Sequence, residues 1–272
     1  MTSVTELAAS GRTPIPGFVA EHLHVTPDQI GRYVLLPGDP GRCEPIARHF
    51  DDARHIATHR EYVTWTGSLL GEPVSVVSTG IGCPSAAIAV EELSRLGADT
   101  FIRVGTSGGM QPFCGVGDLA IVSAAIRDEG TTSHYLPMEF PAVADIDVVD
   151  ALREAARRTG ARAHVGVSQS KDSFYGEIDP DSSPVAPQLH ARWSAWVKGG
   201  AICSEMEAAA IFTVAAIRRR RAGGVMLMAG NLEMPQEELE AAMKTLTLDG
   251  LIGTAVEALR VMIERDHAAA AG

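Results

Sequence analysis

Short apolar runs that end in glycine-rich turns constrain this chain more than any other feature of its sequence. Three of these runs lead directly into glycine: P-G-D-P-G-R at 37–42, S-T-G-I-G at 78–82 and G-T-S-G-G at 105–109. The order strand, glycine turn, helix is typical of an α/β fold with a mostly parallel sheet. Because ligands in such folds bind beyond the carboxyl ends of the strands, these turns are the first candidates for a binding site.

The same patterns predict the limits of the elements. We expect strands at 33–36, 74–78, 101–104, 119–125, 165–168 and 225–228. We expect helices at 84–97, 147–158, 204–221 and 236–265, from early Pro or Ser and late Gly or Arg. A segment rich in Pro, Asp and Ser predicts a loop at 176–187, and residues 1–20 and 267–272 are expected to be loose. Without a repeat or linker, residues 1–272 are expected to form a single α/β domain with a mixed, mostly parallel central sheet flanked by helices.

Charge and cysteine content exclude several classes of protein. The net charge of −11 argues against a nucleic-acid partner. No apolar stretch approaches the length of a membrane span, and the N-terminal region lacks the apolar run of a secretory signal. The four cysteines are scattered, without a C-x-x-C pair, which argues against zinc and for a reducing cytoplasm. Such an acidic chain can bind an anion only where arginines and backbone N–H groups gather.

Two arginines meet this requirement. Arg42 closes the first glycine turn and could hold phosphate with a two-pronged contact, although an ordinary turn with a surface arginine remains an alternative. Arg103 lies within an apolar strand, where a guanidinium is costly unless it is paired. A structural ion pair would explain Arg103, but the hydroxyls of Thr106 and Ser107 in the following turn favour a binding role.

The second turn resembles a dinucleotide fingerprint, so a dehydrogenase is a competing interpretation. G-I-G-C-P-S at 80–85 has serine where G-x-G-x-x-G requires its third glycine. The turn follows the second strand rather than the first, and no strand about 20 residues later ends in an acid. These differences argue against the dehydrogenase.

The S-E-M-E sequence at 204–207 is ambiguous taken alone. It is typical of a capped helix start with acids near the positive end of the dipole. On a helix, Glu205 and Glu207 would project about 200° apart, so we expect at most one of them to face a pocket.

Taken together, these motifs resemble the nucleoside phosphorylase-I family, and within it the uridine phosphorylases. The resemblance covers about residues 20–265 and rests on blocks that occur in the family's order. They are P-G-D-P-x-R, T-H-R-E-Y (58–62), S-T-G-I-G-C-P-S-A-A-I-A-V-E-E-L (78–93), R-V-G-T-S-G (103–108), E-F-P-A-V-A-D (139–145), D-S-F-Y (172–175) and E-M-E (205–207). It implies cleavage of a ribonucleoside by inorganic phosphate, which gives a free base and ribose 1-phosphate without another cofactor.

The resemblance also implies roles for single residues. The phosphate would be held by Gly38, Arg42, Arg103, Thr106 and, from a neighbouring subunit, Arg60. The ribose would be held by His22 of the neighbour, Thr106, Met206 and Glu207, and the base by Ser107, Gly108, Phe174 and Asn231. Arg42, Arg103 and Glu207 would form the catalytic set. Family members are dimers or hexamers with shared sites, and some bind K⁺ at positions that match Glu61, Ile81 and Ser85.

The base-binding half departs from the family pattern. Uridine phosphorylases carry Gln-x-Arg shortly after Phe-Tyr, whereas here Glu177 and Asp179 follow, and Leu232 replaces an expected arginine. Ionised carboxylates offer no donors to uracil carbonyls, so we expect uridine to be a poor substrate and an amino-bearing or modified base to be preferred. The alternative is that both acids are solvated and that backbone groups or water read the base. A purine nucleoside substrate, a nucleoside hydrolase and a silent nucleoside-binding protein also remain open.

Overall fold

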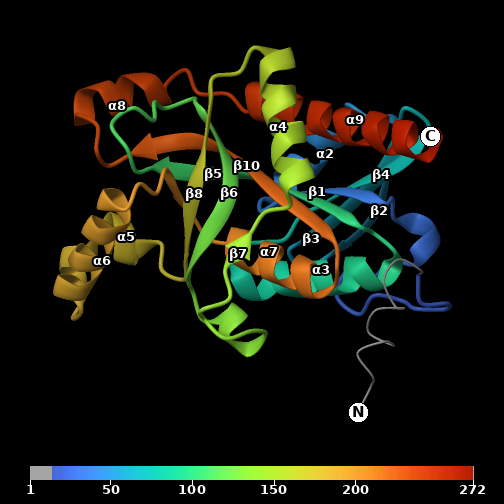
Figure 1. Cartoon of the computed structure of the whole chain (residues 1–272), viewed down its shortest axis with the longest axis horizontal. Coiled ribbons are helices and arrows are strands. Elements are labelled where there is room, and N and C mark those ends of the chain that lie inside the picture. Colours follow the sequence, from blue (N-terminus) through green and yellow to red (C-terminus); the bar gives the residue numbers. More distant parts are fainter. Residues whose placement is uncertain (1–13, 272) are drawn as a thin grey trace.

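A central sheet organises the computed structural model, which describes residues 14–271 (Figure 1). Its strands follow the spatial order β10-β6-β8-β9-β5-β1-β4-β3-β2, with β7 beside β6. The strand bounds are β1 Tyr33–Pro37, β2 Asp51–His59, β3 Tyr62–Leu69, β4 Glu72–Val77, β5 Thr100–Gly109, β6 Leu119–Asp128, β7 Ala142–Val143, β8 Ala163–Lys171, β9 Cys203–Glu205 and β10 Arg221–Asn231.

One part of the sheet closes on itself. Strand β5 pairs with β1, β9 and β10, so the strands β5, β10, β6, β8 and β9 form a ring, and β1, β4, β3 and β2 extend from it as an open arm. Pairing is parallel where β5 meets β1 and β10 and where β8 meets β6 and β9. Since β5 belongs to both parts, residues at its carboxyl end lie at the junction of ring and arm.

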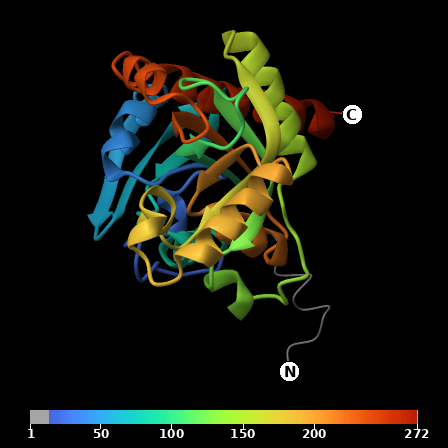
Figure 2. The same ribbon diagram turned by 90° about the vertical axis from the view of Figure 1, so that its left-hand side faces the viewer.

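Helices cover both faces of the sheet (Figure 1). Helices α3 (Cys83–Leu96) and α7 (Ala208–Ile217) contact each other on one face, and α4 (Ile146–Thr159) packs against α9 (Asp249–Ala271) on the other. Each face has its own buried apolar cluster, one around α3 and α7 and one around α4 and α9. The remaining helices are α2 Cys43–Ala47, α5 Tyr175–Ile178, α6 Ala186–Lys198 and α8 Gln236–Met243, with short 3₁₀ turns at Pro27–Gln29, Pro40–Arg42, Thr131–His134 and Pro180–Ser182. Helices α5 and α6 lie together at one end of the molecule in Figure 1, the end that faces the viewer in Figure 2.

The expected α/β fold and its strands are confirmed, but several expected boundaries are wrong. The helix expected at 204–221 spans only Ala208–Ile217, because Cys203–Glu205 pairs with β5 and β8 as strand β9. The expected loop at 176–187 contains α5 and a 3₁₀ turn. The expected long last helix is two helices, with an interruption at 244–248, where the Thr245 hydroxyl bonds the Ala242 carbonyl at 3.3 Å.

The terminal segments are more ordered than expected. Ile15 donates its N–H to the Arg95 carbonyl at 3.0 Å, and Ala20 is buried. Residues 267–271 continue α9, whereas residues 1–13 and 272, which were also expected to be loose, lie outside the described residues. None of the helices in the described part of the chain has the length and apolar character needed to cross a membrane.

Candidate active site

The first two glycine turns lie against each other at the carboxyl ends of β1 and β4. The Gly80 N–H donates to the Gly38 carbonyl at 2.9 Å. A Cβ on Gly38 would lie 3.1 Å from the Gly80 oxygen, so a side chain would crowd this contact. Gly80 has a φ of +70°, in the left-handed region that glycine adopts without strain. The two turns therefore pack backbone against backbone at the end of the sheet, with Gly80 buried and Gly38 half-buried.

The guanidinium of Arg103, on β5, lies beside the Gly38 turn and is held by two carboxylates. Its Nε lies 2.8 Å from Glu205 Oε2, and its Nη2 pairs with Glu207. Burial opposes the positive charge, but Glu207 and Glu205 outweigh it and raise the pKa of Arg103 above its usual value. The third nitrogen, Nη1, is buried without a hydrogen-bond partner, 3.9 Å from where a Cβ of Gly38 would lie.

Arg42 approaches from the first turn, as the sequence suggested. Its Nη2 donates to the Thr106 hydroxyl at 3.4 Å, while its buried Nε makes no hydrogen bond and lies 3.8 Å from Asp39. Burial lowers the pKa of Arg42, with Asp39 acting against it and neighbouring Arg103 in the same direction. Two guanidiniums with unused donors thus flank one glycine turn, an arrangement suited to a multiply charged anion.

Both acids of the E-M-E sequence contact Arg103, so the prediction that only one would face the site is wrong. That prediction assumed a helix, whereas Glu205 ends strand β9 and Glu207 follows in a bend. Glu205 Oε2 also accepts the Glu207 and Ala208 N–H groups at 2.9 Å and so caps α7. Sequence reasoning missed Glu205 as a site residue, although the motif contained it.

Glu207 links Arg103 to the second glycine turn. Its Oε1 accepts the Gly82 N–H at 2.6 Å, and its other oxygen pairs with Arg103. Burial raises the pKa of Glu207, Arg103 opposes this, and Glu205 adds to it. Met206, between the two acids, is half-buried and its carbonyl accepts the Cys83 thiol at 3.2 Å.

Within residues 14–271, neither His22 nor Arg60 forms a hydrogen bond or an ion pair with Arg42 or Arg103. His22 Nδ1 lies 2.7 Å from Glu92 of α3, and its carbonyl is 2.8 Å from His59 Nδ1. The rings of His24 and His59 stack at 3.7 Å. Arg60 follows His59 at the exposed tip of the β2–β3 hairpin. The two residues that the resemblance assigns to a neighbour's site are therefore linked through His59.

The structure brings together only some of the residues expected to bind the nucleobase. Ser107 and Gly108 lie side by side near the end of β5, and Phe174 is exposed beyond β8. Asn231 is buried, and both hydrogens of its amide bond carbonyls, those of Gln111 at 2.9 Å and Cys114 at 2.7 Å. Its oxygen accepts the Glu233 N–H at 2.8 Å. Asn231 thus has no donor left to offer a base.

A cavity of about 470 Å³ opens beside Gly108, between β8, α5 and α6. Glu177 lines it and forms an ion pair with Lys171 Nζ at 2.7 Å. The interpretation of Glu177 as a solvated loop charge is therefore wrong, and so is the premise that this region offers no donor, because Lys171 supplies one. Asp179 is exposed, as the solvated alternative predicted. Lys171 was missed because it precedes the motif, at the end of a strand.

The three residues matched to a K⁺ site also lie close together. The Glu61 side chain and Ser85 Oγ flank Gly80, at 2.7 and 3.5 Å from where its Cβ would be. Ser85 Oγ lies 3.4 Å from the Ile81 carbonyl. Within residues 14–271, no cluster of three His, Cys, Asp or Glu side chains suited to a metal ion occurs.

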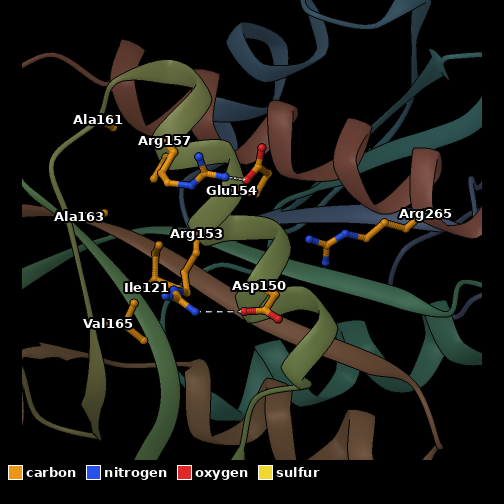
Figure 3. Close-up of a pocket in the computed structure, with 10 residues that line it drawn as sticks. Ile121, Asp150, Arg153, Glu154, Arg157, Ala161, Ala163, Val165 and Arg265 are labelled. Carbon is orange, nitrogen blue, oxygen red and sulfur yellow. Dashed lines mark hydrogen bonds and ion pairs between the residues drawn. The ribbon is translucent and has the colours of Figure 1, made fainter.

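A second cavity, of about 460 Å³, lies far from this chemistry, beside α4 (Figure 3). Two of its three arginines are paired within α4, Arg153 with Asp150 at 3.2 Å and Arg157 with Glu154, and the third, Arg265 of α9, donates to the Asp147 carbonyl at 3.4 Å. Because all three arginines are exposed and each already has a hydrogen-bond or ion-pair partner, we interpret the cavity as a surface groove rather than a competing anion site.

Comparison with known proteins identifies the family. The model of the phosphorylase superfamily matches residues 32–259. The chain belongs to the phosphorylase superfamily. It is 48% identical to a uridine phosphorylase of Treponema pallidum over 90% of this chain and 95% of that one. It is 42% identical to the uridine phosphorylase of Escherichia coli over 80% of this chain and 89% of that one. A guanosine phosphorylase of Halorubrum lacusprofundi is 40% identical over 78% of this chain and 83% of that one. The matched span includes both arginines, both glutamates and the glycine turns of this phosphorylase.

Proposed function

We propose that this protein is a nucleoside phosphorylase that cleaves uridine with inorganic phosphate to uracil and ribose 1-phosphate. The observation that carries the proposal is the pair of buried guanidinium nitrogens without hydrogen-bond partners, Arg103 Nη1 and Arg42 Nε, beside the Gly38 turn. Buried donors are normally satisfied, so an unfilled pair points to a ligand with several acceptor oxygens. Relatives named uridine phosphorylase support the nucleoside assignment. We take residues 1–272 as one domain of this kind.

We propose the following roles, which the family resemblance implies and which the positions of the two arginines and Glu207 support. Phosphate binds to Gly38, Arg42, Arg103 and Thr106, and Glu207, joined to Arg103 and Gly82, accepts hydrogen bonds from ribose hydroxyls over Met206. Ser107 and Gly108 contact the base, with Phe174 at the rim, and Asn231 stiffens the wall behind them.

The reaction requires positioning and charge stabilisation rather than a covalent enzyme intermediate. The C1′–N bond breaks and its electron pair leaves with the base. Phosphate oxygen then bonds C1′ from the opposite face, and the base gains a proton on release. The described thiols fit this view, because burial raises the pKa of the Cys43 thiol to about 12 and leaves it a poor nucleophile.

We also propose that two chains build each site, in a dimer or hexamer. The support is that Arg60 is exposed at the tip of the β2–β3 hairpin, that its neighbour His59 contacts the His22 carbonyl at 2.8 Å, and that neither His22 nor Arg60 bonds Arg42 or Arg103 within residues 14–271. A K⁺ ion held by Glu61, Ile81 and Ser85 at the interface and a cytoplasmic location remain part of the same proposal.

Phosphate-dependent release of base tests the function. Uracil release from uridine is expected only when phosphate is present, with ribose 1-phosphate formed in equal amount. Arg103→Ala is expected to lower the rate at least about 100-fold, comparable to loss of one oxyanion donor. Arg153→Ala, in the groove beside α4, serves as the control and should leave the rate unchanged. Release that is equally fast without phosphate would identify a hydrolase instead.

A further inference from the structure

The ion pair of Lys171 and Glu177 lies between the cavity beside α5 and the strand β9, whose Glu205 holds Arg103. Both side chains are 8% exposed. Ser204, the residue before Glu205 on β9, contacts both: Lys171 Nζ donates to its hydroxyl at 2.6 Å, and the hydroxyl bonds Glu177 Oε2. The pair is thereby held one residue away from the glutamate that holds Arg103.

The hydrogen bonds of this cluster leave one donor and one acceptor unused. An ammonium group has three hydrogens, and Lys171 uses two of them, on Glu177 Oε2 and Ser204. Glu177 Oε2 takes both contacts of its carboxylate, so within the described part of the chain Oε1 accepts no hydrogen bond. Oε1 lies 3.4 Å from where a Cβ of Gly108 would be. A free acceptor and a free donor thus stand next to each other beside the turn expected to contact the base.

The surrounding cavity can hold a planar base. Lys171 and Glu177 line it together with the apolar side chains of Leu189, Trp193 and Leu232. Apolar walls with a few placed polar groups are typical of sites that orient a small ligand. Gln169, also in the lining, gives one amide hydrogen to Asp128 at 2.6 Å, and its Oε1 lies 3.0 Å from the Ser204 hydroxyl, whose one hydrogen it would have to share with Glu177. Lys171 and Glu177 differ from Gln169 in that they present a charged donor and a charged acceptor side by side, next to Gly108.

We infer that Lys171 and Glu177 together recognise the base through two hydrogen bonds. Lys171 donates to a ring carbonyl, and Glu177 Oε1 accepts the adjacent ring N–H. This C(=O)–N(H) unit occurs in uracil, and also in guanine and hypoxanthine. Cytosine and adenine carry the reverse pattern, an amino donor beside a ring-nitrogen acceptor, which would set N–H against ammonium and lone pair against carboxylate. The inference rests on the proposed function. It replaces the expectation of an amino-bearing base. That expectation assumed that this region offers no hydrogen-bond donor, and Lys171 is such a donor.

The C(=O)–N(H) unit is common to the bases of the two nucleosides for which the relatives are named. The Halorubrum protein is named for guanosine and the others for uridine, and both bases present the carbonyl and N–H side by side. In uracil, the carbonyl oxygen also shares the negative charge of the departing base, so an ammonium facing it favours bond cleavage as well as binding.

Substrate ratios test the inference. In the presence of phosphate, wild-type kcat/KM for uridine should exceed that for cytidine at least about 100-fold, because mismatched edges leave buried groups unpaired. Glu177→Gln can present its amide N–H₂ to a ring-nitrogen acceptor, so the uridine-to-cytidine ratio should fall at least about 10-fold. Lys171→Met should lower kcat/KM for uridine more than for cytidine. Asp179→Asn, an exposed acid in the same segment, is the matched control and should keep the wild-type ratio.

The outcomes separate this inference from the proposed function. If no nucleoside releases base in a phosphate-dependent way, the proposed function is wrong. If uridine is cleaved with phosphate but the ratio in Glu177→Gln equals that of Asp179→Asn, only the pair's role is overturned. A folding defect would lower both substrates alike and leave the ratio unchanged, so the ratio itself, with Glu177→Asp as a second variant, distinguishes recognition from stability.

Discussion

The protonation of Glu207 should make the activity of the site depend on pH. Its carboxylate must be ionised to accept hydrogen bonds from ribose, and burial raises its pKa above the usual glutamate value, with Arg103 opposing and Glu205 adding to the shift. As pH falls through this raised pKa, the acceptor becomes protonated and kcat/KM for the nucleoside should fall. The acid limb is therefore expected above the ordinary glutamate range. A profile of kcat/KM against pH measures it, because that quantity reports groups of the free enzyme.

The matched variant for this prediction is Glu207→Gln. It keeps the shape of the side chain but cannot titrate, so its residual activity should lack the acid limb. A variant that keeps the same limb would show that another group, such as phosphate itself, is responsible.

A partly buried group of ion pairs and hydrogen bonds around Asp266 holds helix α9 to the sheet. The Asp266 carboxylate pairs with Arg221 at 2.7 Å and accepts the Tyr33 hydroxyl at 2.7 Å, with Arg32 at 3.2 Å. Burial alone would raise the pKa of Asp266, but the hydrogen bonds from Arg221 and Tyr33 lower it to about 2. One aspartate thus ties the end of α9 to the starts of β1 and β10.

Asp266→Asn is expected to lower the free energy of unfolding at neutral pH by about 1 kcal/mol, after discounting the shift for solvent screening. Since the folded pKa lies below the unfolded one, this stabilisation is complete above about pH 4 and is lost as pH falls toward 2. Denaturant unfolding of both proteins between pH 7 and 3 measures the difference, which should shrink below pH 4. Glu264→Gln, on the exposed pair with Arg158, is the control, and a difference for Asp266→Asn that stays constant with pH would contradict the prediction.

The elements show which parts of a sequence can be interpreted locally. Helix α3 begins and ends where the early proline and Gly97 predicted, because caps and breakers act through neighbouring residues. Strand β9 could not be predicted, because its three residues become a strand only by pairing with β5 and β8. The site divides in the same way. Arg42 and Arg103 were predicted from the turns beside them, whereas Lys171 depends on a partner, Glu177, from another element.

At the scale of the assembly, Arg60 and Glu207 should complement each other between chains. If Arg60 acts in a neighbour's site, Arg60→Ala and Glu207→Ala should each be inactive alone. Mixing them, with denaturation and reassembly, should restore part of the activity, because some mixed sites contain both residues. Activity before and after mixing measures this, with each variant reassembled alone as the control. A wild-type chain that stays fully active as a monomer at low concentration would contradict shared sites.

The ring of strands has a consequence for how the chain is made. Strand β5 is complete at Gly109, yet its partner β10 begins only at Arg221. Thr100 therefore pairs with a residue that is synthesised 121 positions later. During synthesis, β5 therefore leaves the ribosome long before its edge can be covered, and Arg103 emerges about 100 residues ahead of the glutamates that neutralise it. Contacts this distant in sequence make folding slow and leave strand edges open to wrong partners. The nascent chain thus passes the interval from Gly109 to Arg221 with one side of its central strand not yet covered by β10, and that interval is when a chaperone would have most to protect.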